Sequence, residues 1–363
     1  MKAAVLNQDN GKFEIEEVDI DIPKRREVLV AVKASGLCHS DLHMSAGGYG
    51  VALPAVFGHE LAGVVEAIGP DVREFQVGDH VVASLVQYCG HCKACLDGRT
   101  YQCARPEETH RAEAEGPRLS RNGQPLTAVF GTSAFAEYSL VHENQLAKVP
   151  KELPFAQACV LGCGCVTGAG AAINTANVKP GDTVAIIGVG GVGLNVISGA
   201  RLAGAVRIIA IDTQPAKASL ARRFGATDFI DASQADAVER VHALTVTGVD
   251  HAFEVIGLRS TSQQAIKMAR LGGGAYLIGL HKAGATIEVD VLDDLIVRQV
   301  IVRGVYMGSS NIKHDIPMYA QLYLDGRFNL DDLISKEIHI SQINEAYEEL
   351  QTGAIARSVI TSF

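Results

Sequence analysis

The sequence lacks a long hydrophobic run, an excess of positive charge and a leader-like beginning. Its most apolar stretch, 184–197, is interrupted by glycines and an asparagine, and it falls short of the ~20 continuous apolar residues that cross a bilayer. The 363 residues carry 32 Lys and Arg against 41 Asp and Glu, a net charge of −9. This acidic balance argues against a nucleic-acid-binding protein and leaves no polybasic patch for a membrane surface.

The chain begins MKAAVLNQDNGKFEIEEVDI, which has no apolar segment followed by a cleavage site. No secretory signal is indicated, so we expect a cytoplasmic protein. A hydrophobic content of 47% and a charged content of 20% are typical of globular proteins. Because 363 residues are too many for one ordinary core, two domains are expected.

The pattern of the chain changes near residue 160. Before it, short β-branched runs such as VLVAVKASG (28–36) and LAGVVEAIG (61–69) indicate a β-rich domain, with a polar surface loop at 104–128. After it, runs such as TVAIIGVG (183–190) and VRIIAID (206–212) alternate with helical stretches. This alternation predicts βαβ units around a parallel sheet, an α/β fold.

A glycine motif follows the apolar strand VAII and opens a helix. It consists of Gly188, Gly190 and Gly193, with Gly191 and Val192 between them. In a dinucleotide-binding turn, such glycines allow the tight turn, the approach of the backbone to a pyrophosphate and close packing of helix on strand. The helix N-terminus offers free N–H groups to the phosphates. By itself the pattern also fits an ordinary turn.

The next strand ends at Asp212, where an acidic residue holds the ribose hydroxyls of a bound dinucleotide. A carboxylate there repels a 2′-phosphate, so NAD is favoured over NADP. The alternative interpretation of Asp212 is a turn or helix-cap residue. Lys217 could lie beside the ribose, and a solvated lysine is an equally good interpretation.

Four cysteines are clustered with the spacing C-x2-C-x2-C-x7-C: Cys89, Cys92, Cys95 and Cys103. Four thiolates so close together fill the tetrahedral positions of one zinc ion, which indicates a structural site with no position left for substrate. Disulfides are the weaker alternative in a reducing compartment. His91 lies inside this loop and is a possible competing ligand, although a solvated histidine is the simpler interpretation.

Three further segments carry metal-binding residue types: GLCHSDLH with Cys38, GHELAG with His59, and LGCGC with Cys163. Spacing alone does not join them. An isolated buried cysteine is usually a small core residue, and an isolated histidine is usually satisfied by hydrogen bonds.

Over its whole length the chain resembles the zinc alcohol dehydrogenases of the medium-chain dehydrogenase/reductase superfamily. The resemblance rests on GLCHSD, GHELAGVV, the four-cysteine loop, GTSAFAEY, LGCGCVTG, GVGGVG and FEVIG, in that order, and a closing arginine segment. It implies a β-rich, GroES-like catalytic domain over 1–164 and 308–363. It also implies a Rossmann-type NAD-binding domain with a parallel sheet over 165–307.

The resemblance further implies two Zn2+ ions per chain. Cys38, His59 and Cys163 are expected to bind the catalytic zinc, which leaves a fourth position open. Zinc there acts as a Lewis acid on the alcohol, and hydride passes to the nicotinamide. Asp41 is expected to orient His59, and Glu60 to lie behind the metal and help ligand exchange. Simpler alternatives are a turn residue for Asp41 and a buried ion pair for Glu60.

Ser40 and His43 resemble the proton relay of the family, which ends at a histidine because the pKa of imidazole lies close to neutral pH. The alternative for His43 is a surface histidine. His39 stands where many relatives have an arginine against the cofactor pyrophosphate, so looser NAD binding is expected. Arg357 resembles the other pyrophosphate arginine, with a surface salt bridge as the alternative.

The resemblance places Leu85, Val129 and Phe130 in the inner substrate pocket and Tyr49 nearer its mouth, although all four also suit an ordinary core. Apolar walls favour a hydrophobic primary alcohol, oxidised reversibly to its aldehyde. Leu85 stands where larger aromatic residues are frequent, which leaves room for branched or aromatic alcohols.

The first alternative function is a glutathione-dependent formaldehyde (S-hydroxymethylglutathione) dehydrogenase. That branch has an acidic residue near the position of Tyr49 and a basic residue soon after the last loop cysteine. Here Tyr49 is neutral and Glu107 and Glu108 follow Cys103, with Arg111 as a possible substitute. A remote alternative, a non-catalytic protein that binds NAD and zinc, predicts the loss of a zinc ligand or of Ser40, and none is lost.

Assembly is also expected from the resemblance. The segment 104–128 is absent from shorter tetrameric relatives, so a homodimer is favoured. The segment VIVRGVYMG (300–308) resembles an edge strand of the cofactor domain. Pairing with a second copy would extend the sheet and cover that edge.

Overall fold

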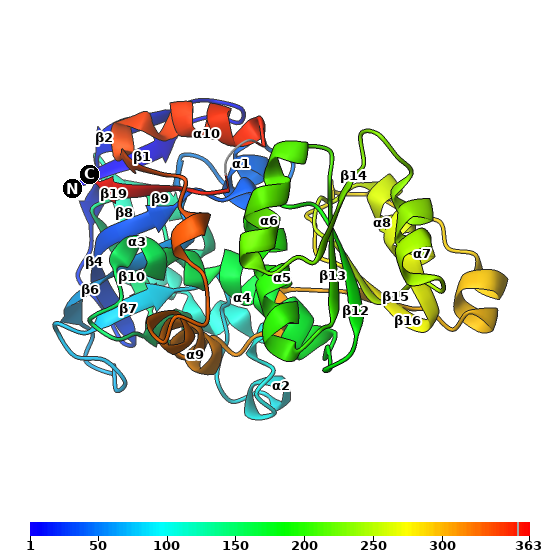
Figure 1. Cartoon of the computed structure of the whole chain (residues 1–363). Coiled ribbons are helices and arrows are strands. Elements are labelled where there is room, and N and C mark those ends of the chain that lie inside the picture. The colour runs from blue at the N-terminus through cyan, green and yellow to red at the C-terminus, as the bar shows by residue number, and fades with distance from the viewer. Residues whose placement is uncertain (354–355) are drawn as a thin grey trace. The chain divides into compact units, whose positions relative to one another are not determined.

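A computed structural model describes residues 1–353 and 356–363 of the chain. Two compact units are present: Met1–Cys163 with Asn311–Phe363, and Gly164–Ser310. Figure 1 shows both units, coloured along the chain. They are described separately below.

The first unit contains two sheets. One has the order β2-β1-β5-β9-β8-β3, and the other has the order β11-β7-β6-β4-β19-β18, with β10 also paired to β4. The strands of the first sheet are β1 (Lys2–Leu6), β2 (Phe13–Glu17), β3 (Asp19–Ile20), β5 (Ala55–Val56), β8 (Leu119–Arg121) and β9 (Gln124–Ala128). Those of the second are β4 (Glu27–Gly36), β6 (Glu60–Ile68), β7 (His80–Ala83), β10 (Tyr138–His142), β11 (Leu146–Lys148), β18 (Lys336–His339) and β19 (Ser358–Ser362).

One expectation about this unit is wrong. The segment 104–128 is not only a surface loop, because its last part forms the β8–β9 hairpin. The two residues between these strands are Asn122 and Gly123, with φ angles of 52° and 74°. Positive φ at both positions is what a tight two-residue hairpin turn requires, and Asn-Gly is its preferred sequence.

The helices of the first unit are short except for one. They are α1 (His39–Ser45), α2 (Lys93–Leu96), α3 (Phe155–Cys159), α9 (Ile312–Leu324) and α10 (Ile343–Gln351). Single 3-10 turns join the strands, among them η2 (Pro106–Thr109), η4 (Val129–Gly131), η5 (Glu143–Gln145) and η6 (Val160–Gly162).

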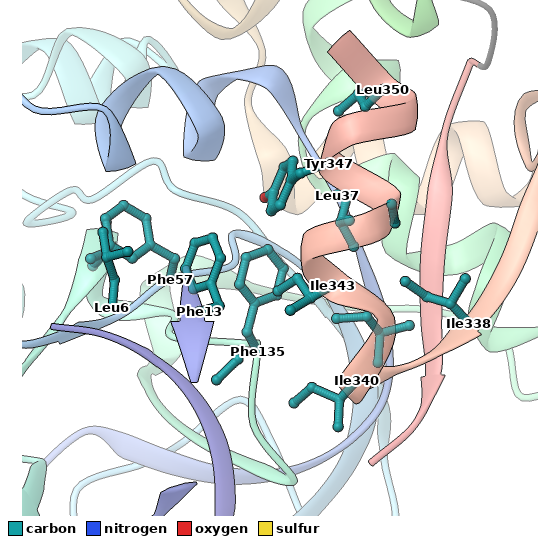
Figure 2. Close-up of a cluster of buried hydrophobic side chains, with 14 of the residues drawn as sticks. Leu6, Phe13, Leu37, Phe57, Phe135, Ile338, Ile340, Ile343, Tyr347 and Leu350 are labelled. Carbon is teal, nitrogen blue, oxygen red and sulfur yellow. The ribbon is translucent and has the colours of Figure 1, made fainter. Parts of the chain in front are cut away.

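A hydrophobic cluster anchors the segments that lead into the site. Figure 2 shows α10 turning Ile343, Tyr347 and Leu350 toward side chains of the sheets. Two members of the cluster, Leu37 and Phe57, are fully buried. Leu37 directly precedes Cys38, and Phe57 lies two residues before His59. Because buried apolar side chains are costly to expose, the backbone that carries both candidate ligands is held in place.

The second unit is built on a six-stranded sheet whose strand pairs are all parallel. Its order is β14-β13-β12-β15-β16-β17, the arrangement of a dinucleotide-binding doubly wound fold. The strands are β12 (Thr183–Ile187), β13 (Arg207–Asp212), β14 (Asp228–Asp231), β15 (Val249–Glu254), β16 (Ala269–Leu277) and β17 (Ile301–Gly304). The helices are α4 (Gly164–Gly170), α5 (Gly191–Ala203), α6 (Ala218–Phe224), α7 (Ala237–Thr245) and α8 (Arg259–Met268).

No single helix among the described residues is long and apolar enough to span a membrane. Within the described ranges, Phe155–Gly162 and Gly164–Thr175 together have the length and apolar composition of such a span, but they form a bent pair.

Candidate active site and metal centres

Strand pairing brings Cys38 and His59 to one place. Strand β4 ends at Gly36, two residues before Cys38, and the antiparallel strand β6 begins at Glu60, one residue after His59. Gly36 and Glu60 are direct partners in the register of this pair. The two candidate ligands therefore emerge at the same end of the sheet from different strands.

Cys163 joins them from the end of η6. A Cβ atom on the preceding residue, Gly162, would lie 2.1 Å from the carbonyl oxygen of Ala83. Only glycine allows this close approach of η6 to β7. The result is a buried group in which the ligand atoms of Cys38, His59, Glu60 and Cys163 all lie within 4.8 Å of one another. The distance from His59 Nε2 to Cys163 Sγ is 3.2 Å.

The donor set of this group fits a zinc ion. Two sulfurs and an imidazole nitrogen are the atoms that zinc prefers, and three ligands leave one position open. The pKa of the Cys38 thiol is held well below its usual value, first by a hydrogen bond from Cys163 and then by the charge of Arg357. Cys38 is thus the more readily ionised of the two thiols.

Asp41 lies behind His59. Its Oδ2 is 2.9 Å from His59 Nδ1, both side chains are fully buried, and the N–H of Gly58 donates to its Oδ1 at 3.3 Å. Burial raises the pKa of Asp41, and the charge of His59 opposes this. The contact leaves Nε2 of His59 as the nitrogen that faces Cys163, which is the arrangement of a histidine ligand supported by a carboxylate.

Glu60 and Arg357 form a buried ion pair. Arg357 donates from Nη2 to Glu60 Oε1 at 2.8 Å and from Nη1 to the carbonyl oxygen of Leu37 at 3.2 Å. Burial raises the pKa of Glu60 to about 7 despite the charge of Arg357. These contacts go to protein rather than to a phosphate site, and the pyrophosphate role expected for Arg357 stays a prediction.

The expected relay residues lie on α1. Ser40 is half-buried and His43 is exposed, which suits an exit to solvent. The ring centroids of His39 and His43 are 6.4 Å apart, as expected for residues one helical turn apart. His39 is exposed, yet desolvation by the surrounding protein lowers its pKa. A neutral His39 is a weak partner for phosphate.

An aromatic side chain covers the buried group. The ring of Phe130 lies 5.4 Å from that of His59, edge to face. Phe130 has a φ of 54°, a conformation that only a minority of non-glycine residues adopt. Leu85 and Val129 are buried, and Tyr49 is half-buried.

Two glutamines that the sequence did not point to hold Phe130 in place. Gln145 is fully buried and donates from Nε2 to the carbonyl oxygens of Phe130 at 2.9 Å and Ser84 at 3.0 Å. Gln87 donates to the same Phe130 carbonyl at 3.3 Å. Gln145 thereby ties together the two segments that present Leu85 and Phe130. No sequence motif marks this role, because it depends on contacts between distant segments.

The four-cysteine loop forms a second group of ligand atoms. The sulfurs of Cys89, Cys92, Cys95 and Cys103 lie within 4.8 Å of one another. Backbone N–H groups also point at sulfur: that of Cys92 at Cys89 Sγ at 3.3 Å, and that of Cys89 at Cys103 Sγ at 3.2 Å. Such donors stabilise thiolates, so this group fits a structural zinc ion.

In the second unit, the glycine motif forms the turn between β12 and α5. Gly188 has a φ of 104°, and a Cβ atom on Gly193 would lie 1.9 Å from the carbonyl oxygen of Gly188. Gly190 caps α5 without a side-chain hydrogen bond, so the first N–H groups of the helix, at Gly191 and Val192, are not capped by that residue.

Asp212 ends β13 and is bonded to this turn. Its Oδ2 accepts from the N–H of Val189 at 2.8 Å and lies 3.0 Å from Lys217 Nζ, and its Oδ1 accepts from the N–H of Gln214 at 3.0 Å. The structure therefore brings the predicted acidic residue, the lysine and the glycine turn together.

Comparison with known proteins defines the class. The profile of the Alcohol dehydrogenase GroES-like domain matches residues 24–151, and that of the Zinc-binding dehydrogenase family matches residues 191–325. These matches correspond to a zinc-dependent dehydrogenase with a GroES-like and a Rossmann-type part. The chain belongs to the zinc-dependent alcohol dehydrogenases of the medium-chain dehydrogenase/reductase superfamily.

Full-length relatives support this assignment. An S-(hydroxymethyl)glutathione dehydrogenase from Haemophilus influenzae is 38% identical over 99% of this chain and 96% of its own length. A benzyl alcohol dehydrogenase from Acinetobacter calcoaceticus is 35% identical, with a TM-score of 0.94 over 100% of this chain and 99% of its own. An alcohol dehydrogenase zinc-binding domain protein from Burkholderia ambifaria is 39% identical, with a TM-score of 0.94 over 99% and 98%.

The predicted family, fold class and cofactors are confirmed. The protein is a zinc-containing, NAD-dependent alcohol dehydrogenase with a catalytic and a structural zinc ion.

Proposed function

We propose that the protein oxidises hydrophobic primary alcohols reversibly to aldehydes, with NAD as the hydride acceptor. The observation that carries this proposal is the ring of Phe130 against His59, with centroids 5.4 Å apart. An aromatic wall directly beside the candidate metal ligands favours an apolar substrate group over a charged one. The name of the benzyl alcohol dehydrogenase neighbour is consistent with this preference.

Each residue of the buried group has a proposed task. Cys38, His59 and Cys163 hold the catalytic zinc, which supplies a Lewis acid when bound. Asp41 fixes the orientation of the His59 ring, from which its Oδ2 is 2.9 Å distant. Ser40 takes up the proton of the alcohol, and the exposed His43 passes it to solvent. Glu60, which is held by its ion pair with Arg357, lies behind the metal position and helps ligand exchange.

The cofactor tasks are proposed on the same basis. Gly188, Gly190 and Gly193 form the turn that admits the pyrophosphate. Asp212 accepts hydrogen bonds from the ribose hydroxyls, which replace its present contact with Lys217. The carboxylate of Asp212 would repel the 2′-phosphate of NADP. NAD lacks this phosphate, so it is the preferred cofactor.

The alternative substrate, S-hydroxymethylglutathione, is favoured by the names of several relatives. A basic residue to hold the glutathione carboxylates would have to be Arg111, since Glu107 and Glu108 follow the last loop cysteine. All five N–H donors of Arg111 are already used inside the protein. They bind the side chains of Asp21 and Glu27 and the carbonyl oxygens of Ile22 and Pro117.

The side chain of Arg111 is only 7% exposed. Releasing it to bind glutathione would break its ion pairs with Asp21 and with the buried Glu27, and only Lys24 and Arg118 would remain as their cationic partners. Breaking a buried ion pair is costly. The structure thus provides a reason to rank the glutathione adduct second.

A screen of NAD reduction tests this ranking. Benzylic, allylic and aliphatic alcohols are compared with formaldehyde plus glutathione, using wild type and Arg111→Ala. We expect the highest kcat/KM with benzylic or allylic alcohols, and Arg111→Ala should leave it within about twofold while lowering the melting temperature. Activity that requires glutathione and disappears in Arg111→Ala would reverse the order of the two substrates.

We also propose that the protein is a homodimer joined through β17. This strand lies at the edge of its sheet, and Ile301 on it is 57% exposed. The adjacent segment η9 (Val291–Val297) exposes further apolar side chains, including Leu292 at 66% and Ile296 at 61%. Strand addition would pair the edge and bury these groups. Light scattering should give twice the chain mass for wild type, and Ile301→Lys should shift it toward the monomer.

A further inference from the structure

A second set of metal-binding groups adjoins the four-cysteine loop. Ligand atoms of Cys89, His91 and Glu108 lie within 4.8 Å of one another. His91 and Glu108 are not needed for the structural zinc ion, because the loop cysteines already supply four sulfurs. Their side chains are 54% and 37% exposed, and all three residues line the same open cavity of about 710 Å3. An ion in solution can therefore reach His91 and Glu108, while Cys89 is buried and is one of the residues that line the cavity.

A backbone contact of His91 prepares it to act as a ligand. Its Nδ1 lies 3.1 Å from the carbonyl oxygen of Cys89. A carbonyl oxygen only accepts, so Nδ1 carries the proton, and in the neutral ring Nε2 has the lone pair. Nε2 is the atom that faces Glu108, with 3.4 Å to its Oε2. When two ligand atoms each lie about 2.0–2.2 Å from one tetrahedral zinc ion, the two atoms are about 3.4 Å from each other, which matches the His91–Glu108 separation.

The charge around the loop favours another cation. Four thiolates and one Zn2+ carry a formal charge of about −2. The loop cations Lys93 and Arg99 are both engaged by Asp97, at 2.9 Å and 2.7 Å. Arg105 lies 3.3 Å from the other carboxylate oxygen of Glu108, Oε1, and leaves Oε2 to face His91. Of the three lone pairs of the Cys89 thiolate, one would bind the structural zinc and one accepts from the N–H of Cys92 at 3.3 Å, which leaves one for a further ion.

We propose that Cys89 Sγ, His91 Nε2 and the carboxylate of Glu108 form an additional, exposed site for a divalent ion of the zinc class, which shares the Cys89 sulfur with the structural zinc. The proposal depends on the four-cysteine loop holding zinc. Sulfur and imidazole donors select zinc, cadmium or cobalt over magnesium and calcium.

The competing explanation is an ordinary ion pair between a protonated His91 and Glu108. It predicts no metal binding and no contribution of the Cys89 sulfur. The His314–Asp315 pair provides a matched control, because its Nδ1–Oδ1 distance is 2.7 Å and its histidine side chain is 75% exposed. Neither residue belongs to any candidate metal group found among the described residues.

The test begins with purified holoenzyme whose two zinc ions have been verified by elemental analysis. Zn2+ is then titrated in a non-chelating buffer against a zinc indicator. We expect one further equivalent in wild type and in His314→Ala, and at least about tenfold weaker binding in His91→Ala and in Glu108→Gln. A tenfold excess of Mg2+ should not compete. If no further equivalent binds, or if binding is equal in all four proteins, the proposal is wrong.

A second measurement asks whether sulfur takes part. Cd2+ is added to the zinc-loaded enzyme, and the ultraviolet sulfur-to-cadmium absorption is followed together with zinc release. We expect the absorption in wild type without stoichiometric zinc release, and its loss in His91→Ala. Absorption accompanied by equal zinc release means simple replacement in the four-cysteine loop and contradicts the shared site. A starting preparation without zinc in the loop would instead contradict the structural-zinc assignment, so the two failures are distinguishable.

Discussion

The first unit contains two groups of metal-binding side chains that are built in opposite ways. The loop group lies between residues 89 and 103, and three of its four cysteines are only half-buried, while Cys89 is buried. The other group collects Cys38, His59 and Cys163 from three separate segments, and every member is buried. The first is a product of local sequence, while the second exists only when the sheets have formed.

Because of this difference, we expect one group to contribute to stability and the other to catalysis. A local loop whose four positions are filled by protein adds stability through its ion and offers nothing to a substrate. A buried group with three ligands and an aromatic cover provides a dry site beside an open position, where electrostatic interactions are strong. Four substitutions sharpen this contrast, ordered by their expected effect on turnover.

The largest effect on turnover is expected for Cys38→Ala. Removal of one of three ligands should release the catalytic zinc, and the loss of several kcal/mol of transition-state stabilisation corresponds to a decrease in kcat/KM of at least about a thousandfold. NAD affinity, measured by fluorescence titration, should change little, because the glycine turn and Asp212 belong to the second unit. Cys159→Ala is the matched control, since Cys159 is equally buried but lies outside the metal group. Equal activity in the two variants would remove Cys38 from the site.

The same contrast explains what could be predicted from the sequence. The four-cysteine loop can be predicted from spacing alone. The glycine turn can be predicted from its spacing together with the strand before it and Asp212 at the end of the next strand, because all of these are local in the sequence. Cys38, His59 and Cys163 were joined only through the family resemblance. Their convergence depends on the register of β4 with β6, where Gly36 faces Glu60, and no spacing rule encodes that register.

Other features lay outside the reach of sequence reasoning for similar reasons. Gln145 acts through two carbonyl oxygens from distant segments, and carbonyl positions leave no trace in residue type. The sequence allows a buried ion pair for Glu60 and a salt bridge for Arg357, but it does not indicate that the two pair with each other, because they lie 297 positions apart. The β8–β9 hairpin is different, because Asn122-Gly123 is a strong local turn signal. The segment 104–128 therefore carries a local signal for this hairpin, although its polar composition predicts a surface loop.

The second-largest effect is expected for Asp41→Asn. The amide keeps the size of the side chain but removes the charge that faces His59 Nδ1 at 2.9 Å. Loss of such a supporting carboxylate weakens zinc binding about 10–100-fold, and turnover should fall in proportion at limiting zinc. Partial recovery of kcat on addition of zinc separates this positioning role from that of a ligand. A variant with normal zinc content and normal kcat would show that the contact is dispensable.

A smaller effect is expected for Gln145→Leu. The substitution removes the side-chain donor of the Ser84 carbonyl oxygen and leaves the Phe130 carbonyl oxygen with only the longer bond from Gln87. The expected cost is about 1–3 kcal/mol in the free energy of unfolding. Because Phe130 loses support for its positive φ, kcat/KM for benzylic alcohols should fall about tenfold, within the range of one pocket contact. Gln87→Leu removes the longer bond, of 3.3 Å, and should have less effect. The ratio of benzylic to short aliphatic activity is the measurement, and an unchanged ratio in both variants would contradict a role in the substrate pocket.

The smallest effect on turnover, combined with a clear effect on stability, is expected for Cys103→Ala in the loop. Three sulfurs remain, so the structural zinc should bind more weakly, and its binding free energy no longer contributes fully to folding. Elemental analysis should show one zinc ion per chain instead of two, and the melting temperature should fall by several degrees. Assayed well below that temperature, the folded enzyme should keep a kcat within about twofold of wild type, because the buried group shares no ligand with the loop. If kcat fell as far as in Cys38→Ala while the protein stayed folded, the two metal groups would be coupled in function. The loop could then not be a purely stabilising centre, separate from the catalytic group that forms with the sheets.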